Sequence, residues 1–151
     1  MNDDWFDLLT ALVDAEVRFL VVGAHAVALH GHVRATQDLD VWVDPSAENA
    51  RKVWRALEAF GAPAAALGIT IGDLETPGMV LQFGLPPNRI DVLTSLSGLA
   101  SFDDAWTGRV EHVIRGRRIP FIGRDALIAN KRASGRPKDR ADLADLGGAD
   151  A

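Results

Sequence analysis

Two short stretches decide the fold: FLVVGAHAVALHG at residues 19–31 and DLDVWV at residues 38–43. The first opens with an apolar, β-branched run, which predicts a strand, and Gly23 separates that strand from a helix-forming run. The second alternates polar and apolar side chains with a period of two, which is typical of a half-buried strand. A strand, a helix and a second strand in close succession predict a mixed α/β (α+β) domain.

The rest of the chain continues this pattern. Strands are expected over residues 18–22, 38–43, 78–83, 89–93, 110–114 and 119–122, and helices over 4–16, 24–29, the stretch between Ser46 and Gly61, 101–106, 125–133 and 137–146. Asp3 or Asp4 is expected to cap the first helix, and Ser46 the third. Residues 62–77 have only weak periodicity, so no element is assigned to them. No repeat or long linker interrupts the chain, and a single domain over residues 1–151 is expected.

Composition excludes several classes of protein. The 151 residues are 48% hydrophobic and 25% charged, which is ordinary for a globular chain and argues against disorder. Because the chain has no cysteine, disulfide scaffolds, thiolate zinc sites and cysteine nucleophiles are excluded. No uncharged apolar run approaches the ~20 residues of a membrane helix, and the acidic first residues differ from a basic signal peptide. We therefore expect a cytoplasmic protein with no membrane partner.

Charge is distributed unevenly along the chain, whose net charge is −5. Residues 109–140 contain ten basic and three acidic side chains, whereas the remainder is strongly acidic. A basic segment on an acidic body can bind a polyanion, although solvated helix and hairpin surfaces explain the same charges. Within the last helix, Asp139 and Asp142 are expected to form exposed ion pairs with their neighbours.

The glycine after the first strand is a candidate anion site. A helix follows Gly23 at once, and the first N–H groups of a helix have no partner inside it and carry the positive end of its dipole. Gly23 lets a ligand approach the backbone closely, and the N–H of Ala24 would face that ligand. Strand–glycine–helix junctions are also common in packing roles, so this feature is weak when taken alone.

Asp38 and Asp40 are stronger candidates, because residues two apart in a strand point to one face, with Cα atoms ~6.6 Å apart. Two neighbouring carboxylates on a mostly apolar strand repel each other and are partly desolvated, and a divalent metal resolves that conflict. The alternative is an ordinary solvent-facing strand edge. Trp42 shares this face and is a candidate for stacking on a base.

Asp91 is the candidate third carboxylate. The stretch RIDVL at residues 89–93 alternates, which turns Asp91 away from the core, and a neighbouring strand could bring it beside Asp38 and Asp40. Three such carboxylates can hold the two metal ions of an in-line phosphoryl displacement, and Asp91 could take the proton of the attacking hydroxyl. The alternative is a turn or an ion-pair residue, for example with Arg89.

These motifs together resemble the polymerase-beta-type nucleotidyltransferase superfamily. The resemblance rests on FLVVGAHAVALHG at residues 19–31, RATQDLD at 34–40, LIANK at 127–131 and GRPKD at 135–139, followed by Asp142 and Leu143. It extends from about residue 17 to 146. The chain is most similar to small stand-alone members related to the toxin nucleotidyltransferases of abortive-infection and toxin–antitoxin systems.

The resemblance implies a mixed sheet flanked by helices and transfer of a nucleoside monophosphate from an NTP to a hydroxyl, with release of pyrophosphate. It implies two Mg²⁺ ions, with Mn²⁺ as an alternative, held by Asp38, Asp40 and Asp91. Gly23 and Ala24 would face the triphosphate, and the implied phosphate or sugar contacts are Arg34, Thr36 and Lys131. The acceptor could be RNA, a protein or a small molecule, and a cognate antitoxin or a second copy of the chain is a candidate partner.

The charge of the site leads to one further expectation. An NTP adds about four negative charges to three carboxylates, so two divalent ions leave a deficit that cationic side chains must cover. Lys131 lies four residues after Leu127, on the same side of its helix. We expect Lys131, together with Arg136 and Lys138, to return to the acidic cleft.

One departure keeps two other functions open. The superfamily usually has Gly or Ser after the first glycine, where this chain has Ala24, so a hydroxyl that could bind the triphosphate is lost. A catalytically degenerate, antitoxin-like or regulatory binding module is therefore an alternative. A metal-dependent phosphohydrolase that uses the same carboxylates is another.

Overall fold

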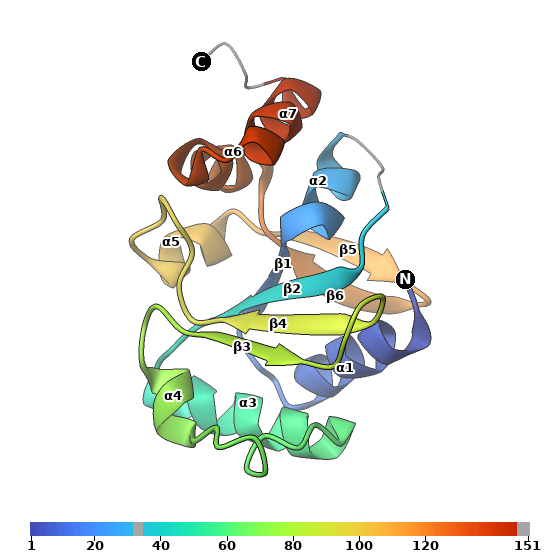
Figure 1. The fold of residues 1–151 in the computed structure, drawn as a ribbon, viewed down its shortest axis with the longest axis vertical. Coiled ribbons are helices and arrows are strands. Elements are labelled where there is room, and N and C mark those ends of the chain that lie inside the picture. The colour runs from blue at the N-terminus through green and yellow to red at the C-terminus, as the bar shows by residue number, and fades with distance from the viewer. Residues whose placement is uncertain (32–34, 148–151) are drawn as a thin grey trace.

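The computed structural model describes residues 1–31 and 35–147. A mixed sheet in the order β3-β4-β2-β1-β6-β5 forms the centre of the molecule (Figure 1). Its strands are β1 (Phe19–Val22), β2 (Asp38–Val43), β3 (Val80–Phe83), β4 (Arg89–Leu93), β5 (Val110–Ile114) and β6 (Arg117–Phe121). The pairs β2·β4 and β1·β6 are parallel, and the other three pairs are antiparallel. The expected mixed sheet is confirmed.

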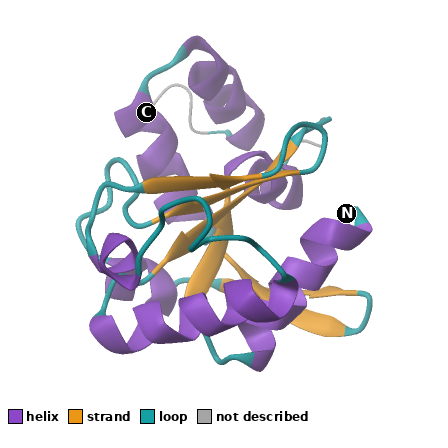
Figure 2. Cartoon of the chain, turned by 60° about the horizontal axis from the view of Figure 1, so that its bottom comes forward, coloured by secondary structure: helices purple, strands orange, loops and turns teal. Residues whose placement is uncertain are grey.

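Helices cover both sides of this sheet. They are α1 (Asp3–Asp14), α2 (Gly23–His30), α3 (Ala47–Phe60), α4 (Ile71–Glu75), α5 (Phe102–Thr107), α6 (Arg124–Ser134) and α7 (Pro137–Leu146). Figures 1 and 2 show α3 on one side of the sheet and α6 and α7 on the other, where α2 also lies. The site described below is built between the sheet and the α2–α6–α7 side.

Most helix ends follow the expected capping rules. Ser46 caps α3, where its hydroxyl accepts a hydrogen bond from the Asn49 amide, and Gly61 ends that helix in the left-handed region at φ 92°. The expected cap of α1 is wrong by one residue, because the side chain of Asn2 accepts the Trp5 amide at 2.8 Å. The segment without an assigned element contains the short helix α4, which begins with a capping box at Thr70.

The core explains why the carboxylate-bearing strands are held rigidly. Leu39, Val41 and Val43 of β2 are fully buried, and Ile90 and Val92 of β4 are nearly so. Their alternation forces the intervening residues to the opposite face of the sheet. Burying a large aliphatic side chain contributes roughly 1.5–3 kcal/mol, so a slip of one residue in either strand would be strongly unfavourable. This packing sets the direction of the functional side chains.

Candidate active site

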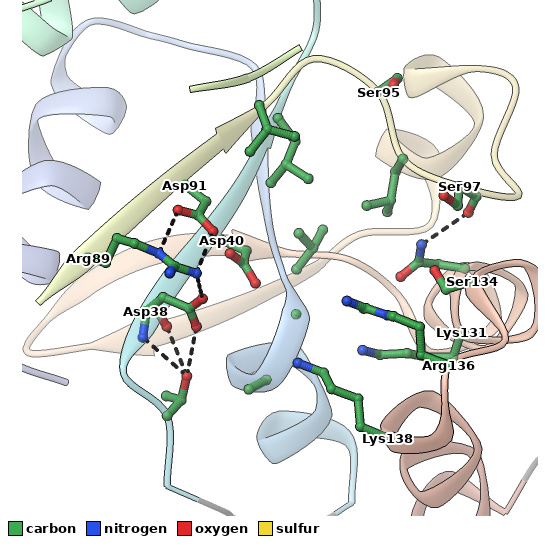
Figure 3. Close-up of a pocket in the computed structure, with 18 of the residues that line it drawn as sticks. Asp38, Asp40, Arg89, Asp91, Ser95, Ser97, Lys131, Ser134, Arg136 and Lys138 are labelled. Carbon is green, nitrogen blue, oxygen red and sulfur yellow. Dashed lines mark hydrogen bonds and ion pairs between the residues drawn. The ribbon is translucent and has the colours of Figure 1, made fainter. Parts of the chain in front are cut away.

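Three carboxylates converge on the face of the sheet that looks toward α2, α6 and α7. Parallel pairing of β2 and β4 places Asp40 directly opposite Asp91, and Asp38 opposite Arg89. Carboxylate oxygens of Asp38, Asp40 and Asp91 lie within 4.8 Å of one another. The structure therefore brings together the three carboxylates that the strand pattern singled out (Figure 3).

The geometry of this cluster is compatible with a divalent cation. Oxygens on opposite sides of an octahedral Mg²⁺ are about 4.2 Å apart, since each Mg–O distance is about 2.1 Å. Carboxylate oxygens within 4.8 Å of one another are therefore close enough to share a cation after small side-chain movements. Carboxylate oxygens are also the ligands that Mg²⁺ and Mn²⁺ prefer.

The electrostatics of Asp40 show how crowded the negative charge is. Burial, repulsion by the carboxylates of Asp38 and Asp91, and a hydrogen bond with Asp91 raise the pKa of Asp40 from 3.8 to about 7, while the positive charge of Lys138 opposes the rise. A carboxyl that retains its proton near neutral pH reflects negative charge that the protein alone does not balance. A cation at this position would remove that imbalance.

Arg89, the first residue of β4, supplies positive charge that partly balances the negative charge of the triad. Its side chain contacts both Asp91 oxygens, from Nε at 3.1 Å and from a terminal guanidinium nitrogen at 3.2 Å. The same terminal nitrogen donates to Asp38 Oδ2 at 2.6 Å. The expected ion pair between Asp91 and Arg89 is therefore present, and Asp91 also belongs to the carboxylate triad. The bridge to Asp38 was not anticipated, although the register of β2 and β4 places Arg89 directly opposite it.

The glycine turn lies against the same carboxylates. Gly23 begins α2 with φ +69°, and a Cβ added there would overlap Asp40 Oδ2. Only glycine satisfies both the positive φ and the close approach of this carboxylate. Gly23 and Ala24 line the cleft, so the start of α2 and the triad face one space.

Thr36 lies next to the triad. Its hydroxyl is 3.0 Å from the backbone carbonyl of Asp38 and 3.1 Å from Asp38 Oδ1, so it helps to orient this carboxylate. Thr36 also lines the cleft. Arg34, the other expected contact on this segment, lies outside the described residues.

A basic wall faces the carboxylates across the cleft. Lys131 of α6, Arg136 at the N-cap of α7 and Lys138 of α7 all line it, and Figure 3 shows their nitrogen atoms turned toward the triad. The basic segment of the sequence therefore returns in part to the acidic centre, as its charge suggested.

The amine of Lys131 is held by carboxylates of α7 as well as lining the cleft. The residue is 3% exposed, and its Nζ lies 3.3 Å from Asp139 Oδ1 and 3.2 Å from Asp142 Oδ2. Asp139 and Asp142 are 0% and 1% exposed, so the expectation that they form exposed ion pairs is wrong. Helices α6 and α7 pack together closely, and these two carboxylates become the counter-ions of the buried Lys131. The position of Lys131 on the same side of α6 as the buried Leu127 was the sequence feature that indicated this burial.

Asp139 organises the basic wall. Burial opposes its ionisation, yet hydrogen bonds from Arg136 and the charge of Lys131 hold the pKa of this carboxyl below its ordinary value. Arg136 Nε donates to Asp139 Oδ2 at 2.8 Å, while more than half of the Arg136 side chain remains exposed. Within the described residues, Lys138 is exposed and forms no ion pair. Lys138 is therefore the wall cation that a ligand can reach without breaking a salt bridge.

The remaining lining of the cleft is mostly neutral. The cleft has a volume of about 780 Å³, and its other lining residues include Met79, Val80, Leu93, Ser95 and Ser97. These side chains offer apolar surface and hydroxyl groups.

Trp42 does not contribute to the cleft. It is 2% exposed and packs edge-on against Phe102, with ring centroids 5.0 Å apart. The hypothesis that Trp42 stacks on a base is therefore wrong, because α5 covers its ring.

None of the helices in the described part of the chain has the length and apolar character that a membrane span requires.

Comparison with known proteins supports the same fold and identifies the family. The structure is similar to that of the lincosamide antibiotic adenylyltransferase LnuA bound to lincomycin, with a TM-score of 0.62 and 17% sequence identity over 99% of this chain and 98% of that chain. At this identity the likeness shows the fold alone. No curated protein matches the sequence. The profile of a family described as "Nucleotidyltransferase of unknown function (DUF6036)" matches residues 6–147, and the chain therefore belongs to this nucleotidyltransferase family.

Proposed function

We propose that the protein transfers a nucleoside monophosphate from an NTP to a hydroxyl of an acceptor in a reaction that depends on Mg²⁺. The observation that carries this proposal is the convergence of Asp38, Asp40 and Asp91 opposite the Gly23 turn and the basic wall. Carboxylates on one side and cations on the other suit a ligand that carries both metal ions and phosphates. We treat residues 1–151 as one domain that performs this reaction.

The residues divide the work as follows. Asp38, Asp40 and Asp91 would hold two Mg²⁺ ions, or Mn²⁺, which when bound neutralise phosphate charge and lower the pKa of the attacking hydroxyl. The backbone at Gly23 and Ala24 would bind the triphosphate through N–H groups, which lie at the positive end of the α2 dipole. Thr36 keeps Asp38 oriented, and Lys138 supplies a mobile positive charge.

The bond changes are those of a substitution at phosphorus. The acceptor oxygen forms a bond to the α-phosphorus, and the bond from that phosphorus to the oxygen bridging the α- and β-phosphates breaks, which releases pyrophosphate. Asp91 would accept the proton of the acceptor hydroxyl and then pass it to water. Arg136 and Lys138 would stabilise the negative charge on the departing pyrophosphate. The amine of Lys131 is held by Asp139 and Asp142, so Lys131 would keep α6 and α7 in place and add positive electrostatic potential to the basic wall, without direct contact with the phosphates.

The acceptor is the open part of this proposal. The neutral, hydroxyl-bearing part of the cleft lining and the similarity in fold to an antibiotic adenylyltransferase support a small hydroxylated molecule. The resemblance to toxin nucleotidyltransferases supports RNA or a protein, with a cognate antitoxin as partner. If the acceptor is needed for growth, wild-type protein should arrest the cells that express it, and the Asp38→Asn variant should not.

The test is a transfer assay with each of the four α-³²P-labelled NTPs, Mg²⁺, and either cellular RNA, cellular protein or a set of hydroxylated small molecules. Label should pass to one acceptor class, and EDTA, Asp38→Asn or Asp40→Asn should abolish the transfer while circular dichroism shows a folded chain. Asp7→Asn, on the exposed face of α1, is the matched control. Release of inorganic phosphate without transfer would replace the proposal with a phosphohydrolase. Binding without turnover of any NTP would favour the degenerate binding module.

A further inference from the structure

We propose that Arg89 is an internal counter-ion that competes with divalent cations for the carboxylate triad, so that this side chain sets the metal affinity of the site. The inference rests on the proposed function, because it takes Asp38, Asp40 and Asp91 as metal ligands. In this inference Arg89 weakens metal binding, whereas the three carboxylates are the metal ligands.

The contacts of Arg89 are with carboxylates that a cation would also bind. Its guanidinium takes both oxygens of Asp91 and Oδ2 of Asp38. Asp38 Oδ1 is meanwhile 3.1 Å from the Thr36 hydroxyl. Two of the three carboxylates therefore have their oxygens engaged by donors of this chain. Each N–H contact takes up one lone pair of a carboxylate oxygen and withdraws electron density from it, so a cation gains its full interaction with these carboxylates only when the guanidinium moves away.

Charge makes the competition stronger than hydrogen bonding alone. A guanidinium is always protonated and carries a full positive charge beside Asp38 and Asp91. Repulsion between this charge and an incoming divalent ion falls only slowly over a few ångströms in a partly desolvated cleft. Removal of Arg89 would also leave the three carboxylates with stronger mutual repulsion, which a cation relieves. Both effects predict tighter metal binding without Arg89.

The arginine can leave the carboxylates without disturbing the fold. Its backbone is held by β-pairing opposite Asp38 and by the Trp5 indole N–H, which donates to the Arg89 carbonyl at 3.2 Å. Its side chain is 31% exposed at the edge of the cleft, so the long stem can swing toward solvent. The displaced guanidinium would remain near the opening of the cleft.

The experiment measures Mn²⁺ binding to the full chain by isothermal titration calorimetry and electron paramagnetic resonance, with no nucleotide present. Arg89→Ala and Arg89→Gln should each bind Mn²⁺ about tenfold more tightly than wild type, on the scale of the loss of a partly exposed, bidentate ion pair. Arg89→Lys, which keeps the charge but not the planar fork, should fall between them and wild type. Arg118→Ala is the matched control, because Arg118 is exposed on β6 and does not line the cleft.

A second measurement distinguishes a change in metal affinity from partial unfolding of a variant. Thermal unfolding in EDTA should show that Arg89→Ala and Arg89→Gln melt below wild type, and saturating Mn²⁺ should recover more of the melting temperature in these variants than in wild type. Equal or weaker Mn²⁺ affinity in both variants, when they are folded, would overturn the proposal. If wild type binds Mn²⁺, Asp38→Asn loses it and the Arg89 variants match wild type, this inference fails while the metal-dependent function stands. If Mn²⁺ binds neither wild type nor any variant, both fail.

Discussion

Replacement of Asp40 by Asn should stabilise the protein in the presence of EDTA and abolish its activity. In the folded state the pKa of Asp40 is raised to about 7 from 3.8, so the folded chain holds a proton that the unfolded chain releases. As pH rises from about 4 to 7, the unfolded state gains relative stability, and the full cost of an ionised Asp40 is present above pH 7. Asn cannot ionise, so Asp40→Asn avoids this cost.

The size of the effect follows from the same shift. One pKa unit corresponds to about 1.4 kcal/mol, and the proton is shared among three coupled carboxylates, so we expect a stabilisation of about 2 kcal/mol at pH 8 that becomes smaller at pH 5. Urea unfolding of wild type and Asp40→Asn at both pH values measures it directly. In Mg²⁺ the order should reverse, since wild type gains stability from the ion and the variant does not.

An Asp40→Asn protein that is no more stable than wild type at pH 8, or whose difference from wild type does not change with pH, would contradict this prediction. The exposed Asp7→Asn variant shows how much a general change in net charge contributes. Its difference from wild type should stay near zero at both pH values.

Other substitutions test the remaining parts of the site. Gly23→Ala should cost more than about 1 kcal/mol in urea unfolding and abolish transfer, because φ is +69° and the new methyl overlaps Asp40. Lys131→Ala should cost about 3 kcal/mol in urea unfolding, since it removes the buried ammonium group that contacts both Asp139 and Asp142. Lys138→Ala should leave the melting temperature unchanged and weaken NTP binding several-fold in calorimetry, more at low salt than at high salt. Ala24→Ser should tighten NTP binding several-fold, because it restores a hydroxyl at the start of α2.

The sequence alone determined the elements that carry the chemistry. Alternation in residues 38–43 and 89–93 set which side chains enter the core, and this placed Asp38, Asp40 and Asp91 on the polar side of their strands. The glycine after β1 located the turn at the start of α2, because glycine breaks the strand and readily adopts the positive φ found there. Local periodicity and turn chemistry were sufficient for these features, since both act over a few residues.

How these parts meet depends on long-range packing, which local pattern does not encode. Parallel pairing of β2 with β4, which are far apart in the chain, puts Arg89 across from Asp38 and turns it into a bridge between two carboxylates. Packing of α6 on α7 buries Lys131 with Asp139, whereas sequence spacing predicted an exposed surface for that helix. Both outcomes depend on which long-range surfaces come into contact, and the free energy that fixes those contacts is spread over the whole core. The local sequence pattern predicts which face of a helix or strand is apolar. It does not predict which polar groups of another helix or strand will contact that face.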